Sequence, residues 1–263
     1  MEPIKVIVSG ASGKVGKEVI NALCLDPETQ LVGAVDLHPG DGNLTLSDGS
    51  SVPFSADLDH ILNVCQPDVM VDFTTAEAVM KSVPVAARRR VNLVIGTTGL
   101  TADNLSRIEQ LAGDNRIGAV VAPNFALGAV LMQHLAKIAA RYMDYAEIIE
   151  LHHHQKIDSP SGTALATARA MAQARGKPFA SPPEQAQAAA SRGQQIEGVT
   201  IHSVRLPGLM AHQEVILGAA GQTLTIRHDT INRECYMPGV LLAVKEVVKR
   251  RGLIFGLDSL LDL

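Results

Sequence analysis

The sequence predicts an α/β protein with a doubly wound parallel sheet and a smaller α+β domain that contains a mixed sheet. In the first half, short apolar runs alternate with helical patterns; the runs are residues 4–9, 31–36, 69–73, 92–95 and 117–122. Later in the chain, three strand-like runs follow one another, at residues 199–205, 213–217 and 222–228. Strands that alternate with helices indicate a parallel sheet, whereas consecutive strands indicate an antiparallel or mixed one.

Composition limits the classes of function. The 263 residues, 46% of them hydrophobic, are enough for a sizeable core. A net charge of -4 and 3% aromatic residues argue against nucleic acid as a partner. No apolar run is long enough to cross a membrane, and the N-terminus lacks a signal-peptide pattern. We therefore expect no membrane partner and a cytoplasmic protein, or a plastid-stromal one if a plant transit peptide was removed.

The three cysteines indicate neither a disulfide framework nor a metal site. Cys24, Cys65 and Cys235 are odd in number, widely spaced and set in apolar or mixed surroundings. We expect them to be buried thiols.

A glycine-rich turn follows the first strand and precedes a helical pattern that runs to Leu25. Its residues are Gly10, Ala11, Ser12, Gly13, Lys14, Val15 and Gly16. In a strand–loop–helix unit, such glycines permit a tight turn, close approach of a pyrophosphate to the backbone, and close packing of the helix. Free N–H groups at the helix N-terminus then face the phosphates.

Asp36 strengthens this otherwise weak motif. It ends the second strand, twenty residues after Gly16, near the separation expected of an acid that binds the ribose of a dinucleotide. Glycines that serve only a turn are the alternative. Because strand, loop, helix, strand and acid occur in the required order, we favour a Rossmann-like nucleotide site.

Further loops follow the later strands of the parallel sheet. The carboxyl ends of such strands line the ligand crevice, which brings in Gly96, Thr97 and Thr98, then Ala122, Pro123, Asn124 and Phe125. Ordinary turn chemistry is the alternative reading of both loops. Helical patterns cover residues 76–90 and 101–112, and Pro84 is expected to kink or divide the first of them.

The stretch from Glu150 to Ala164 is the candidate reacting centre. It contains three of the nine histidines, Lys156, and a strand-to-helix turn with Ser161, Gly162 and Thr163. Ser159 to Thr163 supply a capping hydroxyl, a proline suited to a first turn, and a glycine that lets a ligand approach. Helix-start N–H groups bind anions, and lysine and imidazole can donate protons. We therefore expect an anionic substrate that is protonated during the reaction.

Two other readings of this turn stay open at the level of the residues. The histidines can be merely solvated, or His152 and His154 can be zinc ligands. A zinc site needs further ligands, and no matching His or Cys motif is present. We expect no metal.

Domain boundaries follow from where the strand–helix alternation stops. An apolar helix covers residues 128–143, and residues 176–198 contain an Ala-rich part that can be helical, with flanks that can form a substrate lid. A final amphipathic helix at residues 239–251 is expected to pack on the first domain. The prediction is a dinucleotide-binding domain of residues 1–125 and 236–263, and a substrate and oligomerisation domain of residues 126–235.

With these motifs in this order, the chain resembles the dihydrodipicolinate reductases of lysine biosynthesis, also called 4-hydroxy-tetrahydrodipicolinate reductases. The His-His-x-x-Lys-x-Asp-x-Pro-Ser-Gly-Thr pattern from His152 to Thr163 is far more specific than the glycine loop, and the likeness covers the whole chain. The resemblance implies an open sheet in the second domain, a homotetramer, and reduction of a cyclic dicarboxylate in the diaminopimelate route with hydride from NADH or NADPH. Two departures, His154 and Gln155, occupy positions where other members often carry Arg and His, which puts substrate affinity in doubt.

The resemblance also implies roles for residues. By it, His152 is the proton donor and acceptor and Lys156 the second proton donor. The substrate contacts are His153, Ser161, Gly162 and Thr163. The glycine loop and Asp36 match the phosphate and ribose contacts, and residues 96–98 and 122–125 match the nicotinamide-side loops.

Asp36 favours NADH over NADPH, because its charge repels a 2'-phosphate. Several family members carry an Arg at the position of Leu37, whereas Lys14 and His38 restore part of the positive charge. We expect NADH to be preferred and NADPH accepted. The alternatives are another Rossmann dicarboxylate reductase and a non-enzymatic dinucleotide sensor. Aspartate-semialdehyde dehydrogenase shares the layout but needs a nucleophilic cysteine, for which none of the three is suitably placed.

Overall fold

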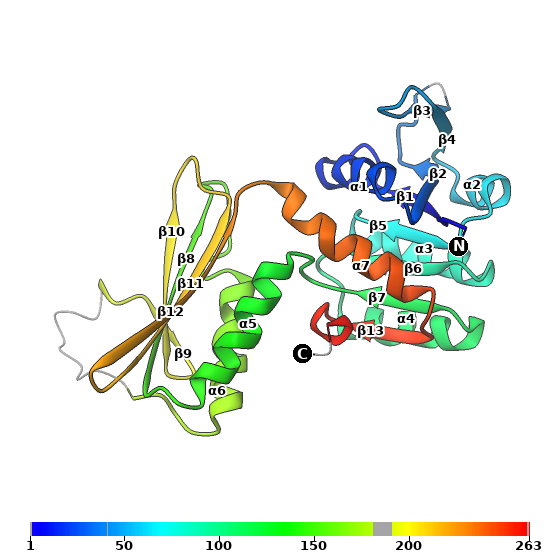
Figure 1. The fold of residues 1–263 in the computed structure, drawn as a ribbon. Coiled ribbons are helices and arrows are strands. Elements are labelled where there is room, and N and C mark those ends of the chain that lie inside the picture. The colour runs from blue at the N-terminus through cyan, green and yellow to red at the C-terminus, as the bar shows by residue number, and fades with distance from the viewer. Residues whose placement is uncertain (1, 41, 181–190, 262) are drawn as a thin grey trace. The chain divides into compact units, whose positions relative to one another are not determined.

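The computed structural model describes residues 2–40, 42–180, 191–261 and 263. The chain forms two compact units (Figure 1). One unit comprises Met1–Leu127 together with Arg233–Leu263, and the other comprises Gly128–Asn232. The first unit is therefore built from two separate stretches of the chain.

The first unit contains an eight-stranded sheet in the order β13-β7-β6-β5-β1-β2-β4-β3. All neighbours pair in parallel except β3 and β4. Parallel strands buried on both faces need near-continuous apolar runs, and β5 and β7 are buried at every residue. The strands are β1 (Ile4–Ser9), β2 (Thr29–Val35), β3 (Asn43–Thr45), β4 (Ser51–Ser55), β5 (Val69–Asp72), β6 (Asn92–Ile95), β7 (Gly118–Val121) and β13 (Gly252–Phe255).

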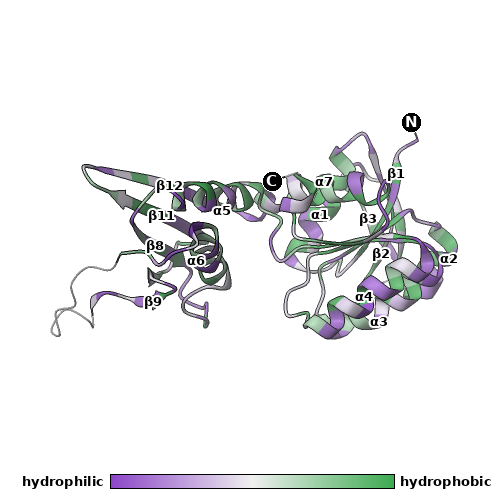
Figure 2. Cartoon of the chain, turned by 90° about the horizontal axis from the view of Figure 1, so that it is seen from below, coloured by the Kyte–Doolittle hydropathy of each residue, from purple (hydrophilic) through white to green (hydrophobic). Residues whose placement is uncertain are grey.

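Helices cover both faces of this sheet. Figure 2 shows α1 and α7 on one face and α3 and α4 on the other. A buried cluster that includes Ile7, Met70 and Leu93 holds α2, α3 and α4 against the sheet. The predicted doubly wound α/β architecture is thus confirmed. The helices are α1 (Lys14–Leu25), α2 (Leu58–Cys65), α3 (Ala76–Arg88), α4 (Ala102–Asn115) and α7 (Met237–Val247), with short 3-10 helices η2 (Arg233–Tyr236) and η3 (Asp258–Leu260).

The second unit contains a five-stranded sheet in the order β12-β11-β8-β10-β9. Among its described strands, only β8 and β10 pair in parallel, so the sheet is mixed, as predicted. Figures 1 and 2 show α5 and α6 on the same face, and Ile148, Met171 and Val215 are buried there. The elements are α5 (Leu127–Ala140), β8 (Tyr145–His152), α6 (Gly162–Arg175), β9 (Gln194–Ile196), β10 (Val199–Arg205), β11 (Ala211–Ala219) and β12 (Gln222–Thr230).

Pro84 was expected to kink or divide its helix, and it does not divide it, because α3 continues through that residue. A proline inside a helix costs about 3 kcal/mol. Val79, Val83 and Ala86 are fully buried on the sheet, and each buried valine contributes about 1.5 to 3 kcal/mol. Packing therefore outweighs the missing hydrogen bond.

Two other expectations differ from the structure, and a third falls on residues that the structure does not describe. The cysteines are not all buried: Cys24 is exposed, and Cys65 and Cys235 are partly exposed. The final helix, expected over residues 239–251, ends at Val247 and is followed by β13. The Ala-rich part of the candidate lid, residues 181–190, lies outside the described residues. Within the described chain, no helix has the length and apolar character needed to cross a membrane.

Gly16 and Gly113 offer a matched test of close packing, because both lie inside helices. A Cβ at Gly16 would lie 2.1 Å from the Gly10 carbonyl oxygen, whereas a Cβ at Gly113 meets nothing within 4 Å. We predict that Gly16→Ala lowers the free energy of unfolding by about 1 to 3 kcal/mol through overpacking. Gly113→Ala should raise it by about 0.5 to 1 kcal/mol. Thermal and urea unfolding measure both, and equal effects of the same sign would contradict the packing argument.

Candidate functional site

The glycine loop joins β1 to α1 in the first unit. Gly10 has φ +84°, a conformation that favours glycine, and a Cβ there would lie 2.8 Å from the Phe73 carbonyl oxygen. Gly13 is the N-cap of α1 and provides no side-chain hydrogen bond to the first turn. The N-terminal N–H groups of α1 are therefore open to an anion. Of the other loop residues, Ser12 and Lys14 are exposed, whereas Ala11 and Gly16 are buried.

Asp36 holds this loop through its carboxylate. The Ser12 N–H donates to Oδ2 at 2.8 Å, and the Leu37 N–H donates to Oδ1 at 2.7 Å. A carboxylate offers about four acceptor positions, so both oxygens can still accept from ribose hydroxyls. An open helix N-terminus beside a fixed acid therefore fits a dinucleotide.

Asp72 connects the loops that follow β5 and β6. Its carboxylate is fully buried and accepts from the Thr74 N–H at 3.0 Å, the Thr74 hydroxyl at 2.6 Å, and the Thr97 and Ser82 hydroxyls at 3.2 Å each. Burial raises the pKa of Asp72, and these hydrogen bonds only partly oppose that effect. The buried acid fixes Thr97 against Thr74, whose N–H also donates to the Thr97 hydroxyl at 2.9 Å.

The two loops predicted on the nicotinamide side follow β6 and β7, which are neighbours in the sheet. The Phe73 ring fills the space beside Gly96, where a Cβ would lie 2.1 Å from the ring. The same ring packs on Phe125, with centroids 5.6 Å apart. Among the predicted contacts, Thr98 and Pro123 are exposed, Asn124 is partly exposed, and Thr97, Ala122 and Phe125 are buried.

In the second unit, His152 and Glu150 lie at the end of β8 on the same face of the sheet, because residues two apart on a strand share a face. The His152 Nδ1 is 2.5 Å from Glu150 Oε2. The Glu150 side chain is fully buried, whereas that of His152 is 14% exposed. Because this contact uses Nδ1, Nε2 remains for a substrate.

Glu150 is a buried carboxylate with several donors. Arg205 from β10 donates to both oxygens, at 2.9 Å to Oε2 and 2.8 Å to Oε1, and the Ser161 N–H donates to Oε1 at 3.2 Å. Burial raises the pKa of Glu150, but hydrogen bonds from His152, Arg205 and Ser203 outweigh it and lower the pKa to about 2. The carboxylate is therefore charged at neutral pH.

The loop between β8 and α6 carries the remaining charged residues. Lys156 Nζ pairs with Asp158 Oδ1 at 2.7 Å, and its side chain is 23% exposed. Arg205 also donates to the Asp158 carbonyl oxygen at 2.7 Å. His153 and His154 are exposed. Among the described residues, no group of three His, Cys, Asp or Glu side chains is arranged to hold a metal ion.

Helix α6 begins at Gly162, with Ser161 as its N-cap. The Ser161 hydroxyl accepts from the Ala164 N–H at 3.2 Å. Nothing lies within 4 Å of a Cβ placed on Gly162, and the first turn contains no acidic residue. The helix start is thus a suitable anion site. Pro160 lies before the N-cap rather than in the first turn.

Sequence reasoning missed Arg205 and gave no role to Glu150 or Asp72. The alternation Glu-x-His on a strand could have shown Glu150 and His152 on one face. Arg205 lies opposite His152 only because of the register between β10 and β8. No local pattern in the sequence gives that register.

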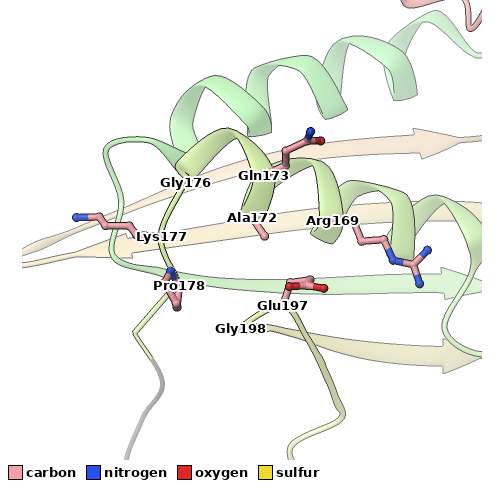
Figure 3. A pocket seen from close by; sticks show the side chains of 8 residues that line it. All are labelled: Arg169, Ala172, Gln173, Gly176, Lys177, Pro178, Glu197 and Gly198. Carbon is pink, nitrogen blue, oxygen red and sulfur yellow. The ribbon is translucent and has the colours of Figure 1, made fainter.

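A separate hollow of about 750 Å³ lies at the other end of α6 (Figure 3). It contains none of the predicted site residues, and the view shows Arg169 and Glu197 among the side chains around it. Its lining consists of Arg169, Ala172, Gln173, Gly176, Lys177, Pro178, Glu197 and Gly198. The candidate reacting groups therefore belong to the N-terminal end of α6.

Solved structures similar to this chain include a reductase and a more distant dehydrogenase. A dipicolinate-bound dihydrodipicolinate reductase from Paenisporosarcina sp. TG-14 is 39% identical, has a TM-score of 0.86, and is covered over 98% of its length by 97% of this chain. An aspartate semialdehyde dehydrogenase II from Vibrio cholerae is 14% identical, with a TM-score of 0.51, and covers 95% of this chain and 99% of its own. The second likeness shows the fold alone.

Sequence comparisons identify the family. Residues 4–125 match the family model "Dihydrodipicolinate reductase, N-terminus", and residues 128–261 match "Dihydrodipicolinate reductase, C-terminus". The 4-hydroxy-tetrahydrodipicolinate reductase of Dehalococcoides mccartyi is 59% identical over 100% of both chains, and that of Moorella thermoacetica is 47% identical over 98% of both. These findings decide against a non-enzymatic sensor. The chain belongs to the dihydrodipicolinate reductase family, and its activity is the pyridine-nucleotide-dependent reduction of 4-hydroxy-tetrahydrodipicolinate in lysine biosynthesis.

Proposed function

We propose that His152 and Lys156 deliver the protons of this reduction, and that the start of α6 binds a carboxylate of the substrate. The observation that carries the proposal is the shared carboxylate of Glu150. It contacts both His152 Nδ1 and the Ser161 N–H, so a proton donor and the helix start belong to one site. A cyclic substrate that needs a proton and carries anionic groups suits this pair.

Several residues of this turn each contribute to substrate binding. The N–H groups of Gly162 and Thr163 have no partner within the helix, because the first turn of a helix leaves them unpaired. They bind one carboxylate, and Ser161 acts through the turn, since its hydroxyl caps the helix. His153 is exposed and adds a further contact. The structural relative with bound dipicolinate supports a dicarboxylate in such a site.

The cofactor contacts lie in the first unit. The glycine loop holds the pyrophosphate at the start of α1, Asp36 accepts from the adenosine ribose, and residues 96–98 and 122–125 line the nicotinamide side. When bound, the reduced nicotinamide supplies the hydride. The buried Asp72 keeps Thr74 and Thr97 in fixed positions, so the loops after β5 and β6 are preorganised.

We predict that His152→Ala and Lys156→Ala each lower kcat by about 100- to 10,000-fold, the usual contribution of general acid–base catalysis. NADH affinity should stay within about twofold, because both residues lie in the second unit. Steady-state kinetics with freshly generated substrate and fluorescence titration of NADH measure the two effects.

Two variants serve as controls for that prediction. Lys177→Ala removes an exposed lysine at the other end of α6 and should leave kcat unchanged. His153→Ala should act chiefly on KM. If His152→Ala or Lys156→Ala instead weakened NADH binding at normal kcat, the role given to that residue would be wrong.

Asp36 supports a preference for NADH over NADPH. Its oxygens are fixed by two N–H groups, so the charge stays near the ribose position. Two unit charges 4 Å apart near a surface interact by about 4 kcal/mol. Leu37 is 82% exposed and adds no cation, whereas Lys14 offsets part of the repulsion of a 2'-phosphate. NADPH is therefore disfavoured and still accepted.

The test is the ratio of kcat/KM for NADH to kcat/KM for NADPH at fixed ionic strength. We expect a ratio above one in the wild type and a shift of about tenfold toward NADPH in Asp36→Ser, equivalent to about 1.4 kcal/mol. Asp36→Asn, which removes the charge and keeps one carbonyl acceptor, should shift the ratio in the same direction. A wild-type preference for NADPH, or no shift in either variant, would refute this account.

The proposed assembly is a homotetramer formed through the second unit. Among the described elements, α5 and α6 cover one face of its sheet, and the other face carries Ile149, Ile216 and the exposed Tyr145. Sheets with one uncovered face that carries apolar side chains are suited to pack on another copy. Light scattering should give about four times the chain mass of 27.9 kDa, and a monomeric mass at micromolar concentration would overturn the assembly.

A further inference from the structure

The ion pair between Glu150 and Arg205 connects three separate parts of the second unit. Glu150 lies on β8, Arg205 lies on β10, and the Ser161 N–H that reaches the same carboxylate belongs to the start of α6. The Glu150 side chain is fully buried, and that of Arg205 is 18% exposed. A charge pair in this position therefore holds two strands and a helix start in one arrangement.

Glu150, one member of the pair, fixes the imidazole of His152. The ring contacts Glu150 Oε2 through Nδ1. Since a charged carboxylate only accepts hydrogen bonds, Nδ1 must carry a proton in this contact. A neutral ring then has a free lone pair on Nε2, and a charged ring has an Nε2–H to give. The carboxylate thus sets both the tautomer and the direction of the ring, as the second partner of a functional histidine does.

Arg205, the other member of the pair, holds the loop that carries Lys156. One Arg205 nitrogen, Nη2, donates to both Glu150 Oε1 and the Asp158 carbonyl oxygen, at 2.8 Å and 2.7 Å. The carboxylate of Asp158 in turn pairs with Lys156 Nζ at 2.7 Å. A planar guanidinium can make these contacts at once, whereas the single ammonium of a lysine cannot match the bidentate geometry.

Stability alone is a poor explanation for this pair. Buried ion pairs often contribute little net stability, because desolvation offsets their attraction, and well-packed apolar residues can replace them. Here each member of the pair reaches a group in the proposed site: Glu150 reaches His152, and Arg205 reaches the loop of Lys156. The contacts of the pair thus coincide with the two groups whose direction the chemistry requires.

We propose that Glu150 and Arg205 are positioning residues that set the directions of His152 and Lys156 together, so that both proton donors depend on one buried ion pair. This inference rests on the roles proposed above for His152 and Lys156. It assigns to Glu150 the choice of the His152 tautomer, and to Arg205 the placement of the loop that carries Lys156 and Asp158.

The experiment uses the full chain with Glu150→Gln and Arg205→Lys. Because a displacement of about 1 Å can cost about 100-fold in rate, we expect kcat to fall about 100-fold in each variant. The affinity for NADH should remain within about twofold. The matched control is Asp144→Asn, which removes another carboxylate that pairs with an arginine, Arg175, in the same unit; its kcat should equal that of the wild type.

Two readouts separate positioning from a general loss of structure. The ¹⁵N shifts of the His152 ring should report a protonated Nδ1 in the wild type and a mixture of tautomers in Glu150→Gln. In a double-mutant cycle, Glu150→Gln should lower kcat clearly less in the His152→Ala background than in the wild type, because residues that act as a unit are strongly non-additive. Independent, multiplicative losses, or an unchanged tautomer, would overturn the inference.

If a single variant fails to fold, the next step is to remove both charges of the pair together. Glu150→Gln combined with Arg205→Met leaves no unpaired buried charge, so the fold should return. A folded double variant with low kcat supports positioning, whereas recovery of kcat with the fold shows a purely structural pair and overturns it. If His152→Ala itself kept normal kcat, the proposed function would fail as well. A slow His152→Ala beside a normal Glu150→Gln would refute this inference alone.

Discussion

The second unit depends on one buried carboxylate, that of Glu150. A charge in this position is tolerated only because a guanidinium, an imidazole and a backbone N–H surround it. Each donor comes from a different element, so the carboxylate requires β8, β10 and the start of α6 to meet at one point. The same requirement brings a histidine and a helix N-terminus together. The hydrogen bonds that the buried carboxylate requires thus bring the residues of the candidate site together.

Much of the fold follows from the sequence because parallel strands buried on both faces are continuous apolar runs. The runs at residues 4–9 and 92–95 coincide with β1 and β6. Short elements such as β3 and α2 were not predicted, because three to eight residues carry too little periodicity. Pro84 shows the opposite failure: a strong local signal for a break is overruled by burial of its neighbours on the sheet.

The candidate site was predictable where its residues are adjacent in the chain. The turn from His152 to Thr163 contains both proposed proton donors and a helix start within twelve residues, and the glycine loop contains its own helix start. Arg205 could not be found this way, because only the register of β10 against β8 sets it opposite His152. Asp72 was missed for a related reason: its partners Thr74 and Thr97 come from two loops that meet only when β5 and β6 pair.

Glu150 and Asp72 solve the same problem in opposite ways. Both are buried acids that hold a loop, but Glu150 has a cationic partner and a lowered pKa, whereas Asp72 has only hydroxyl and N–H donors and a raised pKa. The difference suits their surroundings. A charged Glu150 orients the imidazole of His152 through its contact with Nδ1. Asp72 has no cation beside it, so burial raises its pKa, and the hydroxyl and N–H donors that surround its carboxylate hold together the loops after β5 and β6.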